Sequence, residues 1–180
     1  MGDPVFATLG PSGSNHDLVL NDYKTCNQIA GEVRLCPDFD EVLQICATGE
    51  ADHILICAAH GSCAKVVGEA QYRLGLKITD VFICESQPLA ILHRAETPTS
   101  IGLHPATRSY ADLSSYDRVF DVASTVEAAA GLRDGRWDAA LTARRFADSD
   151  LKLVKAIGPP RDAWLVLSRT EKMPVRTLSG

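Results

Sequence analysis

Short runs of apolar residues alternate along the chain with stretches whose apolar residues recur at helical spacing. The first pattern predicts buried strands and the second predicts helices. The expected strands cover residues 5–9, 53–57, 81–84, 89–92, 100–103, 118–122, 139–142, 151–157 and 163–167. The expected helices cover residues 14–23, 39–47, 64–74, 106–113, 124–135 and 143–147. This alternation predicts an α/β fold in which helices cover the faces of a sheet with parallel strands.

Two of the expected helices begin with a capping box. Asp38 is followed three residues later by Glu41, and Ser124 is followed in the same way by Glu127. In this motif the first side chain accepts a hydrogen bond from a backbone N–H group, and the second reaches back to the start of the helix. The motif therefore predicts where both helices begin.

The composition narrows the class of protein. Of the 180 residues, 46% are hydrophobic, which is enough for a packed core and too many for a disordered chain. The formal net charge of -5 disfavours general binding to nucleic acids or to anionic membranes. No apolar run approaches the roughly 20 residues needed to span a bilayer. The length fits one domain, or two small lobes that share one cleft.

The six cysteines form no C-x-x-C pair, so we expect no structural zinc site. Several lie inside apolar runs, as Cys46 and Cys57 do, which is typical of buried, reduced thiols in a cytoplasmic protein. A nucleophilic cysteine needs a base and an electropositive neighbourhood. Only Cys63, three residues after His60, comes close to this requirement in the sequence.

Four turns follow expected strands and precede expected helices: residues 10–16, 58–63, 103–107 and 123–125. In α/β sheets, ligands bind at the carboxyl ends of the strands, near helix N-termini. These turns therefore hold most of the candidate site residues.

The first turn is rich in small and hydroxyl residues, and Ser12, Gly13 and Ser14 are its candidate ligand contacts. Backbone N–H groups at such a helix start bind a carboxylate or a phosphate. No lysine follows the last glycine, so the turn is not a Walker loop. An ordinary glycine turn with a serine cap is the alternative. His16, at the end of the turn, is a candidate for proton transfer.

The second turn contains His60 between small residues, and a histidine on such a turn can act as a general acid or base. Ser62 beside it is a candidate ligand contact. In the third turn His104 precedes a proline at the expected first helical position, and Thr107 follows. The alternative for His60 is a solvated loop histidine. The alternative for His104 is a side chain that hydrogen-bonds to backbone groups of its own turn.

The fourth turn offers Ser124 and Thr125, whose cap hydroxyl and neighbouring N–H groups can face a ligand or simply begin the helix. Arg144 follows the expected strand at 139–142. An arginine at this place can hold a carboxylate with two hydrogen bonds, and an exposed helical arginine is the alternative.

Five segments resemble, in order, motifs of the prephenate dehydratase family. Residues 8–14 (TLGPSGS) are similar to its opening G-P-x-G-[ST] loop, and residues 54–57 stand at its V-V-P-I-E-N-S segment. Residues 103–106 resemble its S-H-P-Q-A turn, residues 124–129 its S-T-x-x-A-A helix start, and residues 138–141 the strand that follows. The resemblance covers about residues 5–168.

The resemblance implies a two-lobed α/β fold like that of type II periplasmic binding proteins over residues 1–170, with the ligand cleft between the lobes. We expect one lobe to span roughly residues 1–90 plus 150–170 and the other residues 91–149. Residues 171–180 are expected to form a flexible tail. Because members of the family often dimerise, we also expect a homodimer.

Two family motifs are replaced in this chain. Residues 58–62 (AAHGS) stand in place of the E-N-S segment, and residues 162–167 (DAWLVL) in place of a T-R-F motif whose threonine is thought to serve dehydration. Stand-alone prephenate decarboxylases of bacilysin-type pathways show similar losses and a similar ending, which makes Trp164 a candidate substrate contact. A dehydratase-like protein of tropodithietic acid biosynthesis belongs to the same divergent, secondary-metabolic group.

The resemblance thus implies a lyase that decarboxylates or dehydrates a prephenate-like cyclic carboxylate without a metal ion or other cofactor. Helix N-termini at residues 12–15 and 124–125 would hold carboxylates, and His16, His60 or His104 would move a proton. We expect a small-molecule substrate and no nucleic-acid or membrane partner. Two alternatives remain open: a non-catalytic binding or sensor module for small carboxylates, and an enzyme on a tropone or aromatic thioester precursor that uses Cys63 covalently.

Overall fold

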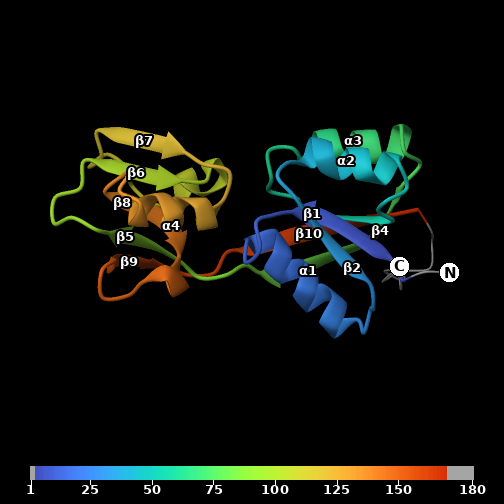
Figure 1. The fold of residues 1–180 in the computed structure, drawn as a ribbon, viewed down its shortest axis with the longest axis horizontal. Coiled ribbons are helices and arrows are strands. Elements are labelled where there is room, and N and C mark those ends of the chain that lie inside the picture. Colours follow the sequence, from blue (N-terminus) through green and yellow to red (C-terminus); the bar gives the residue numbers. More distant parts are fainter. Residues whose placement is uncertain (1–2, 170–180) are drawn as a thin grey trace, which may run out of the picture. The chain divides into compact units, whose positions relative to one another are not determined.

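The computed structural model describes residues 3–169, and the chain divides into two compact units (Figure 1). Unit 1 consists of the chain up to Cys84 together with the chain from Arg161 onward. Unit 2 is Glu85–Pro160. The tail predicted for residues 171–180 lies outside the described residues.

Unit 1 is built on a mixed five-stranded sheet in the order β2-β1-β3-β10-β4. Strand β1 runs parallel to β2 and β3, and β10 runs antiparallel to β3. Every residue of β3 is buried, which explains why this strand is an unbroken apolar run after its first residue. The strands are β1 (Val5–Leu9), β2 (Glu32–Cys36), β3 (His53–Cys57), β4 (Lys77–Glu85) and β10 (Arg161–Ser168).

Helices cover both faces of this sheet (Figure 1). Helices α2 and α3 pack with Ile54 and Ile56 in one hydrophobic cluster, and α1 packs with Leu55 and Trp164 in another. Because successive side chains of a strand point to opposite faces, β3 contributes to both clusters. The helices are α1 (Asn15–Cys26), α2 (Phe39–Ala47) and α3 (Cys63–Tyr72).

Unit 2 repeats this plan with the strand order β7-β6-β8-β5-β9. Strand β6 runs parallel to β7 and β8, and β5 runs antiparallel to β8 and β9. Helix α4 packs on one face of the sheet, and a 3₁₀ turn with the loop after it packs on the other. The elements are β5 (Leu89–His93), β6 (Ser100–Leu103), the 3₁₀ turn η1 (Pro105–Tyr110), β7 (Arg118–Asp121), α4 (Thr125–Arg133), β8 (Ala139–Ala143), the 3₁₀ turn η2 (Arg144–Phe146) and β9 (Lys152–Ile157).

The α/β class and most element positions are as predicted, but both sheets are mixed, because β10 and β5 run against their neighbours. The strand Glu32–Cys36 was not predicted. Its exposure alternates at the edge of the sheet, so it carries no buried apolar run.

The helix predicted for residues 106–113 is a 3₁₀ turn that ends at Tyr110. The boundaries between the lobes also differ from the prediction. Lys152–Ile157 pairs with Leu89–His93, so this strand belongs to unit 2 and not to the first lobe.

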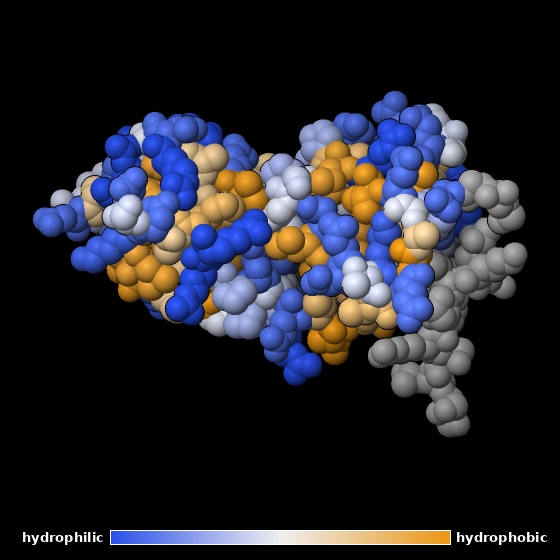
Figure 2. Space-filling view, turned by 60° about the horizontal axis from the view of Figure 1, so that its bottom comes forward, coloured by the Kyte–Doolittle hydropathy of each residue, from blue (hydrophilic) through white to orange (hydrophobic). Residues whose placement is uncertain are grey.

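None of the helices within residues 3–169 combines the length and the hydropathy needed to cross a membrane. Figure 2 shows one face of the molecule, on which hydrophobic side chains reach the surface in several places among hydrophilic ones. Three of the large hydrophobic side chains that are exposed belong to one strand, β4: Ile78, Val81 and Ile83.

Candidate functional site

Four ring side chains come together in unit 1 where β1, β2 and β3 end. The His16 ring lies 5.7 Å from the His60 ring and 4.9 Å from Trp164, measured between ring centroids. Phe39 lies 5.7 Å from His16 and 5.0 Å from His60. All four contacts are edge-to-face, an arrangement that aromatic rings favour. Two predicted site histidines are thereby held in one cluster.

Three of the rings lie on the turns or helix starts that follow β1, β2 and β3, and the fourth lies on a strand paired with β3. His16 is the second residue of α1, and Phe39 is the first residue of α2, whose start is fixed by the Asp38 side chain. His60 lies in the turn between β3 and α3. Trp164 lies on β10 directly opposite Cys57, the last residue of β3. The site is therefore built where ligands bind in α/β sheets.

Backbone contacts favour one tautomer of each histidine. The Ser62 N–H group donates to Nδ1 of His60 at 3.1 Å, and the Cys57 N–H group donates to Nε2 of His16 at 3.5 Å. A ring nitrogen that accepts a hydrogen bond carries no proton, so neutral His60 carries its proton on Nε2 and neutral His16 on Nδ1. Each neutral ring is thus a hydrogen-bond donor on the side away from its backbone contact.

The N-terminus of α1 is closed by its own side chains. The Asp17 carboxylate accepts hydrogen bonds from the Gly13 N–H group at 2.7 Å and from the Ser12 hydroxyl at 3.3 Å. The Ser14 hydroxyl caps the helix and donates to the Leu9 carbonyl. The donors expected to hold a ligand carboxylate therefore already serve an internal one, and the charge of Asp17 opposes a second anion there.

The N-terminus of α3 is different. Its N-cap residue, Ser62, makes no side-chain capping hydrogen bond, and the turn before the helix contains His60. A helix N-terminus attracts anions through its aligned N–H groups. Cys63, the first residue of α3, is partly buried, and this burial raises the pKa of its thiol. A nucleophilic thiol needs the opposite shift, so the geometry disfavours covalent catalysis by Cys63.

Trp164 is fully buried in the cluster beneath α1, with Phe6 and Leu20 among its neighbours. Its indole Nε1 has no hydrogen-bond partner in the described structure. The predicted substrate contact is therefore a core side chain here, and it reaches the site through the ring of His16.

In unit 2, His104 and Thr107 serve their own turn. Nδ1 of His104 accepts a hydrogen bond from the Ala106 N–H group at 3.2 Å, and the Thr107 hydroxyl donates to the His104 carbonyl at 2.8 Å. Burial lowers the pKa of His104, against the opposing charge of Asp121. His104 is thus held neutral and caps the 3₁₀ turn.

The start of α4 is a closed capping box. The Ser124 hydroxyl accepts from the Glu127 N–H group at 3.0 Å, and the Glu127 carboxylate accepts from the Ala123 N–H group at 2.9 Å. The Thr125 carbonyl accepts a hydrogen bond from the Thr142 hydroxyl. Arg144 is exposed at the start of η2. The geometry accounts for Ser124 and Thr125 as parts of the helix start.

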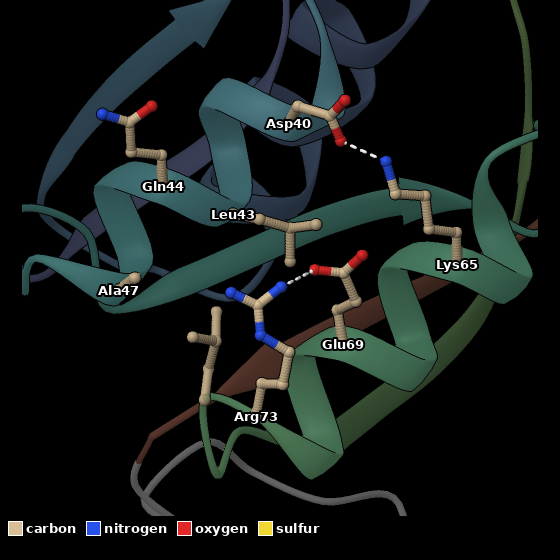
Figure 3. Close-up of a pocket in the computed structure, with 8 residues that line it drawn as sticks. Asp40, Leu43, Gln44, Ala47, Lys65, Glu69 and Arg73 are labelled. Carbon is tan, nitrogen blue, oxygen red and sulfur yellow. Dashed lines mark hydrogen bonds and ion pairs between the residues drawn. The ribbon is translucent and has the colours of Figure 1, made fainter.

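A groove of about 400 Å³ lies between α2 and α3, away from the histidines (Figure 3). The ion pair between Lys65 of α3 and Asp40 of α2 crosses the groove. The ion pair between Glu69 and Arg73 lies along the α3 side. These charges satisfy one another at an exposed surface. Within residues 3–169, no three His, Cys, Asp or Glu side chains gather as a metal ion would require.

Sequence reasoning missed Phe39 and Asp17, which decide how the site works. In the sequence, Phe39 has the pattern of an ordinary core residue of an amphipathic helix. Its contact with His60 is visible only in the folded structure. Asp17 could have been predicted from the sequence, because an acidic residue in the first turn of a helix commonly accepts hydrogen bonds from the N–H groups there.

No family model and no curated protein matches the sequence. The fold matches several solved structures. A prephenate dehydratase from Arthrobacter aurescens, in complex with L-Phe, is similar with a TM-score of 0.70 at 22% identity, over 96% of this chain and 63% of that one. A prephenate dehydratase from Staphylococcus aureus gives 0.63 at 13% identity, over 93% and 67%.

GqqA, a quorum quenching acylase, is similar with a TM-score of 0.63 at 16% identity, over 94% of this chain and 65% of that one. Periplasmic binding domains of bacteria match with TM-scores of 0.51–0.53. The chain therefore has the prephenate dehydratase-like α/β fold, which is related to that of type II periplasmic binding proteins. It spans about two thirds of the length of the first three of these proteins. A fold of this kind hosts both enzymes and binding proteins, so the site must carry the argument on function.

Proposed function

We propose that the protein is a cofactor-independent lyase that acts on a prephenate-like cyclic carboxylate. The observation that carries the proposal is the pair His16 and His60, held edge to face as donors beside the uncapped N-terminus of α3. The fold shared with prephenate dehydratases supports the choice of substrate class.

In this proposal the N-terminus of α3 and the Ser62 hydroxyl bind one carboxylate of the substrate. The turn of His60 leads directly into this helix, so the ring lies beside the bound anion. Backbone dipoles at a helix N-terminus are fixed in place and stabilise negative charge without reorganising during the reaction.

The histidines then supply the proton. In decarboxylation the bond between the ring and its carboxylate carbon breaks, CO₂ leaves, and the electron pair moves into the ring diene. Nε2–H of His60 or Nδ1–H of His16 delivers a proton to the distant carbon, and solvent restores it to the imidazole. In dehydration CO₂ leaves in the same way, the electron pair moves through the ring and expels the ring hydroxyl group, and the histidine proton converts this group to water. The two reactions differ in which atom of the substrate lies nearest the donor.

The residues replaced relative to the dehydratases favour decarboxylation in a secondary-metabolic pathway. His60 itself stands within the segment that replaces the family's E-N-S motif. All six cysteines are free thiols, three of them buried, which fits a cytoplasmic site for this chemistry.

The test is to incubate the purified protein with prephenate and follow substrate and products by mass. The informative variants keep the backbone contacts of the rings. In His60→Asn the amide oxygen takes the place of Nδ1, and in His16→Gln it takes the place of Nε2. Each change keeps the acceptor and replaces the imidazole by an amide, which does not act as a general acid. We expect each variant to lower kcat by about 100-fold or more. His93→Gln, in unit 2, is the matched control and should retain wild-type turnover.

If the wild-type protein consumes no prephenate to either product, the prephenate proposal is wrong. If both donor variants turn over like the wild type, the histidine pair is not the site.

A small-carboxylate binding module is the second candidate. Two hydrogen-bond donors beside a helix N-terminus suit recognition of an anion, and periplasmic binding domains share the fold. Binding without turnover distinguishes the two functions: prephenate would then raise the melting temperature of the wild type, would not be consumed, and would lose this effect in His60→Asn.

A further inference from the structure

Phe39 contacts both histidines of the candidate site. Its ring lies 5.0 Å from the ring of His60 and 5.7 Å from that of His16, with interplanar angles of 70° and 69°. The two imidazole rings lie 5.7 Å apart. Each of the three rings therefore touches the other two, and the closest of these contacts joins Phe39 to His60.

Phe39 is itself a core side chain. It is 4% exposed and belongs to the hydrophobic cluster of α2 and α3, together with Val42 and Leu43. A phenyl ring can neither donate nor accept a proton, and a side chain so deeply buried offers almost no surface to a substrate. Any effect of Phe39 on a reaction must therefore pass through the histidines.

The start of α2 fixes the place of Phe39. The Asp38 side chain accepts a hydrogen bond from the Glu41 N–H group at 2.9 Å and so caps the helix of which Phe39 is the first residue. The Cys36 carbonyl, at the end of β2, accepts from the Gly10 N–H group at 2.8 Å, which joins this region to the turn after β1. Phe39 thus approaches the histidines from a fixed support.

The ring of His60 needs such a support. Its Nδ1 accepts from the Ser62 N–H group at 3.1 Å, which holds one edge of the ring. The χ2 torsion of histidine is broad, so a hydrogen bond at one nitrogen leaves the ring able to turn about that contact. An edge-to-face contact with the ring of Phe39 opposes this motion. The hydrogen bond and the ring contact together determine the direction of Nε2–H.

The ring of His16 depends less on Phe39. The indole ring of Trp164 lies 4.9 Å from it, closer than Phe39 does, and Trp164 belongs to the separate hydrophobic cluster under α1. Loss of the phenyl ring should therefore release His60 and largely spare His16. This difference makes His16 an internal reference for any change at Phe39.

We propose that Phe39 is a positioning residue, which holds the ring of His60 with Nε2–H directed at the substrate. The hold on the ring is a property of the fold. Its effect on turnover rests on the proposed lyase function, because only then does Nε2–H deliver a proton.

The first test observes the histidine rings by ¹⁵N NMR in the absence of substrate. Phe39→Leu and Phe39→Met keep an apolar side chain in the core and remove the planar ring. In both variants the second neutral tautomer of His60 should appear, while His16 should keep the tautomer of the wild type. Val42→Ala removes buried atoms from the same helix and cluster, and it should leave both histidines unchanged. An unchanged His60 in the two Phe39 variants, or an equal change in Val42→Ala, would overturn the proposal.

The second test measures prephenate turnover. Phe39→Leu should lower kcat about tenfold and leave KM within about twofold of the wild type, because a misdirected donor slows the proton transfer and not the binding. In a His60→Asn background, where this donor is absent, Phe39→Leu should change kcat by less than about twofold. A full tenfold loss in that background as well would show that Phe39 does not act through His60. If the wild type consumes no prephenate, the lyase proposal fails, and the NMR measurement still decides whether Phe39 holds the ring of His60.

Discussion

In unit 1 the turns after β1, β2 and β3 bring two histidines and a phenylalanine together, whereas in unit 2 the turns after β6 and β7 are each closed by a side chain that accepts from a backbone N–H group of its own turn. The strand plans of the two sheets are alike. What differs is how each helix start satisfies its N–H groups. At the start of α4 the Ser124 side chain accepts a hydrogen bond from a backbone N–H group of the helix. The start of α3, beside His60, has no such side-chain cap.

This difference shows that a shared architecture does not fix where the chemistry lies. A side-chain cap engages N–H groups at a helix start. At α3 the N–H groups of Ser62 and Cys63 bond to His60, and the Ser62 side chain caps none of the N–H groups that follow. If this difference matters, changes at the helix starts of unit 2 should alter stability, and changes beside His60 in unit 1 should alter ligand binding.

The largest expected effect is on the core of unit 2. Gly131 lies inside α4, and a Cβ atom there would meet the ring of buried Trp137 at 2.0 Å. Gly131→Ala should therefore lower the free energy of unfolding by about 3 kcal/mol. The matched control is Gly68→Ala inside α3, where nothing lies within 4 Å of the added atom. This control should be more stable than the wild type by up to about 1 kcal/mol. Urea unfolding measures both, and equal effects would contradict the packing described for Trp137.

The next effect concerns the closed start of α1. Asp17→Ala removes the acceptor for Gly13 and Ser12 and should lower the free energy of unfolding by about 2 kcal/mol. Because this carboxylate repels an anion, the variant should not bind prephenate more weakly than the wild type does. Urea unfolding and calorimetric titration give the two values. Loss of prephenate binding in a folded Asp17→Ala protein would place the ligand at α1 instead of α3.

Two serines at helix starts should behave in opposite ways. Ser124→Ala removes a formed cap and should lower the free energy of unfolding by about 1 kcal/mol. Ser62→Ala removes no capping bond, so stability should stay within about 0.5 kcal/mol of the wild type while KM for prephenate rises. Thermal unfolding and steady-state kinetics separate the two roles. A stability loss in Ser62→Ala equal to that in Ser124→Ala would show that α3 is capped after all.

The smallest effect is a pH dependence of stability in each unit. Burial lowers the pKa of His53 in unit 1, and of His93 and His104 in unit 2. A histidine whose pKa is lower in the folded state contributes its full stability above the unfolded pKa of about 6.5. That stability is lost as the pH falls below this value. Both units should therefore lose stability between about pH 7 and pH 5.

The two tryptophans allow each unit to be followed separately in this experiment. Trp137 belongs to unit 2 and Trp164 to unit 1, so single-tryptophan variants report the two urea midpoints by fluorescence. A midpoint for unit 2 that does not move over this pH range would contradict the lowered pKa values of His93 and His104.

The sequence predicted the fold well where burial is continuous. The strand His53–Cys57 and the starts of α2 and α4 lie where apolar runs and capping boxes placed them. The strand Glu32–Cys36 escaped prediction because Glu32 and Arg34 alternate with half-buried residues at an edge. The 3₁₀ turn after β6 escaped prediction because hydrogen bonds within residues 104–107 compete with a regular helix.

The candidate site was predictable only in part. The turn chemistry and the family resemblance pointed to His16, His60 and His104 alike. Nothing in the spacing shows that the rings of His16 and His60 meet. Their tautomers depend on the N–H groups of Cys57 and Ser62, which become visible only in three dimensions. Trp164 was predicted as a substrate contact, but the structure buries it under α1, and this burial depends on the antiparallel pairing of β10.

The most direct test of the comparison uses the five histidines as reporters. NMR of protein labelled with ¹⁵N in its histidine rings resolves each tautomer and its response when prephenate is added. The account predicts a proton on Nδ1 of His16 and on Nε2 of His60, with the largest shifts at these two rings and little change at His53 and His93. A largest response at His104, with His16 and His60 unmoved, would contradict it.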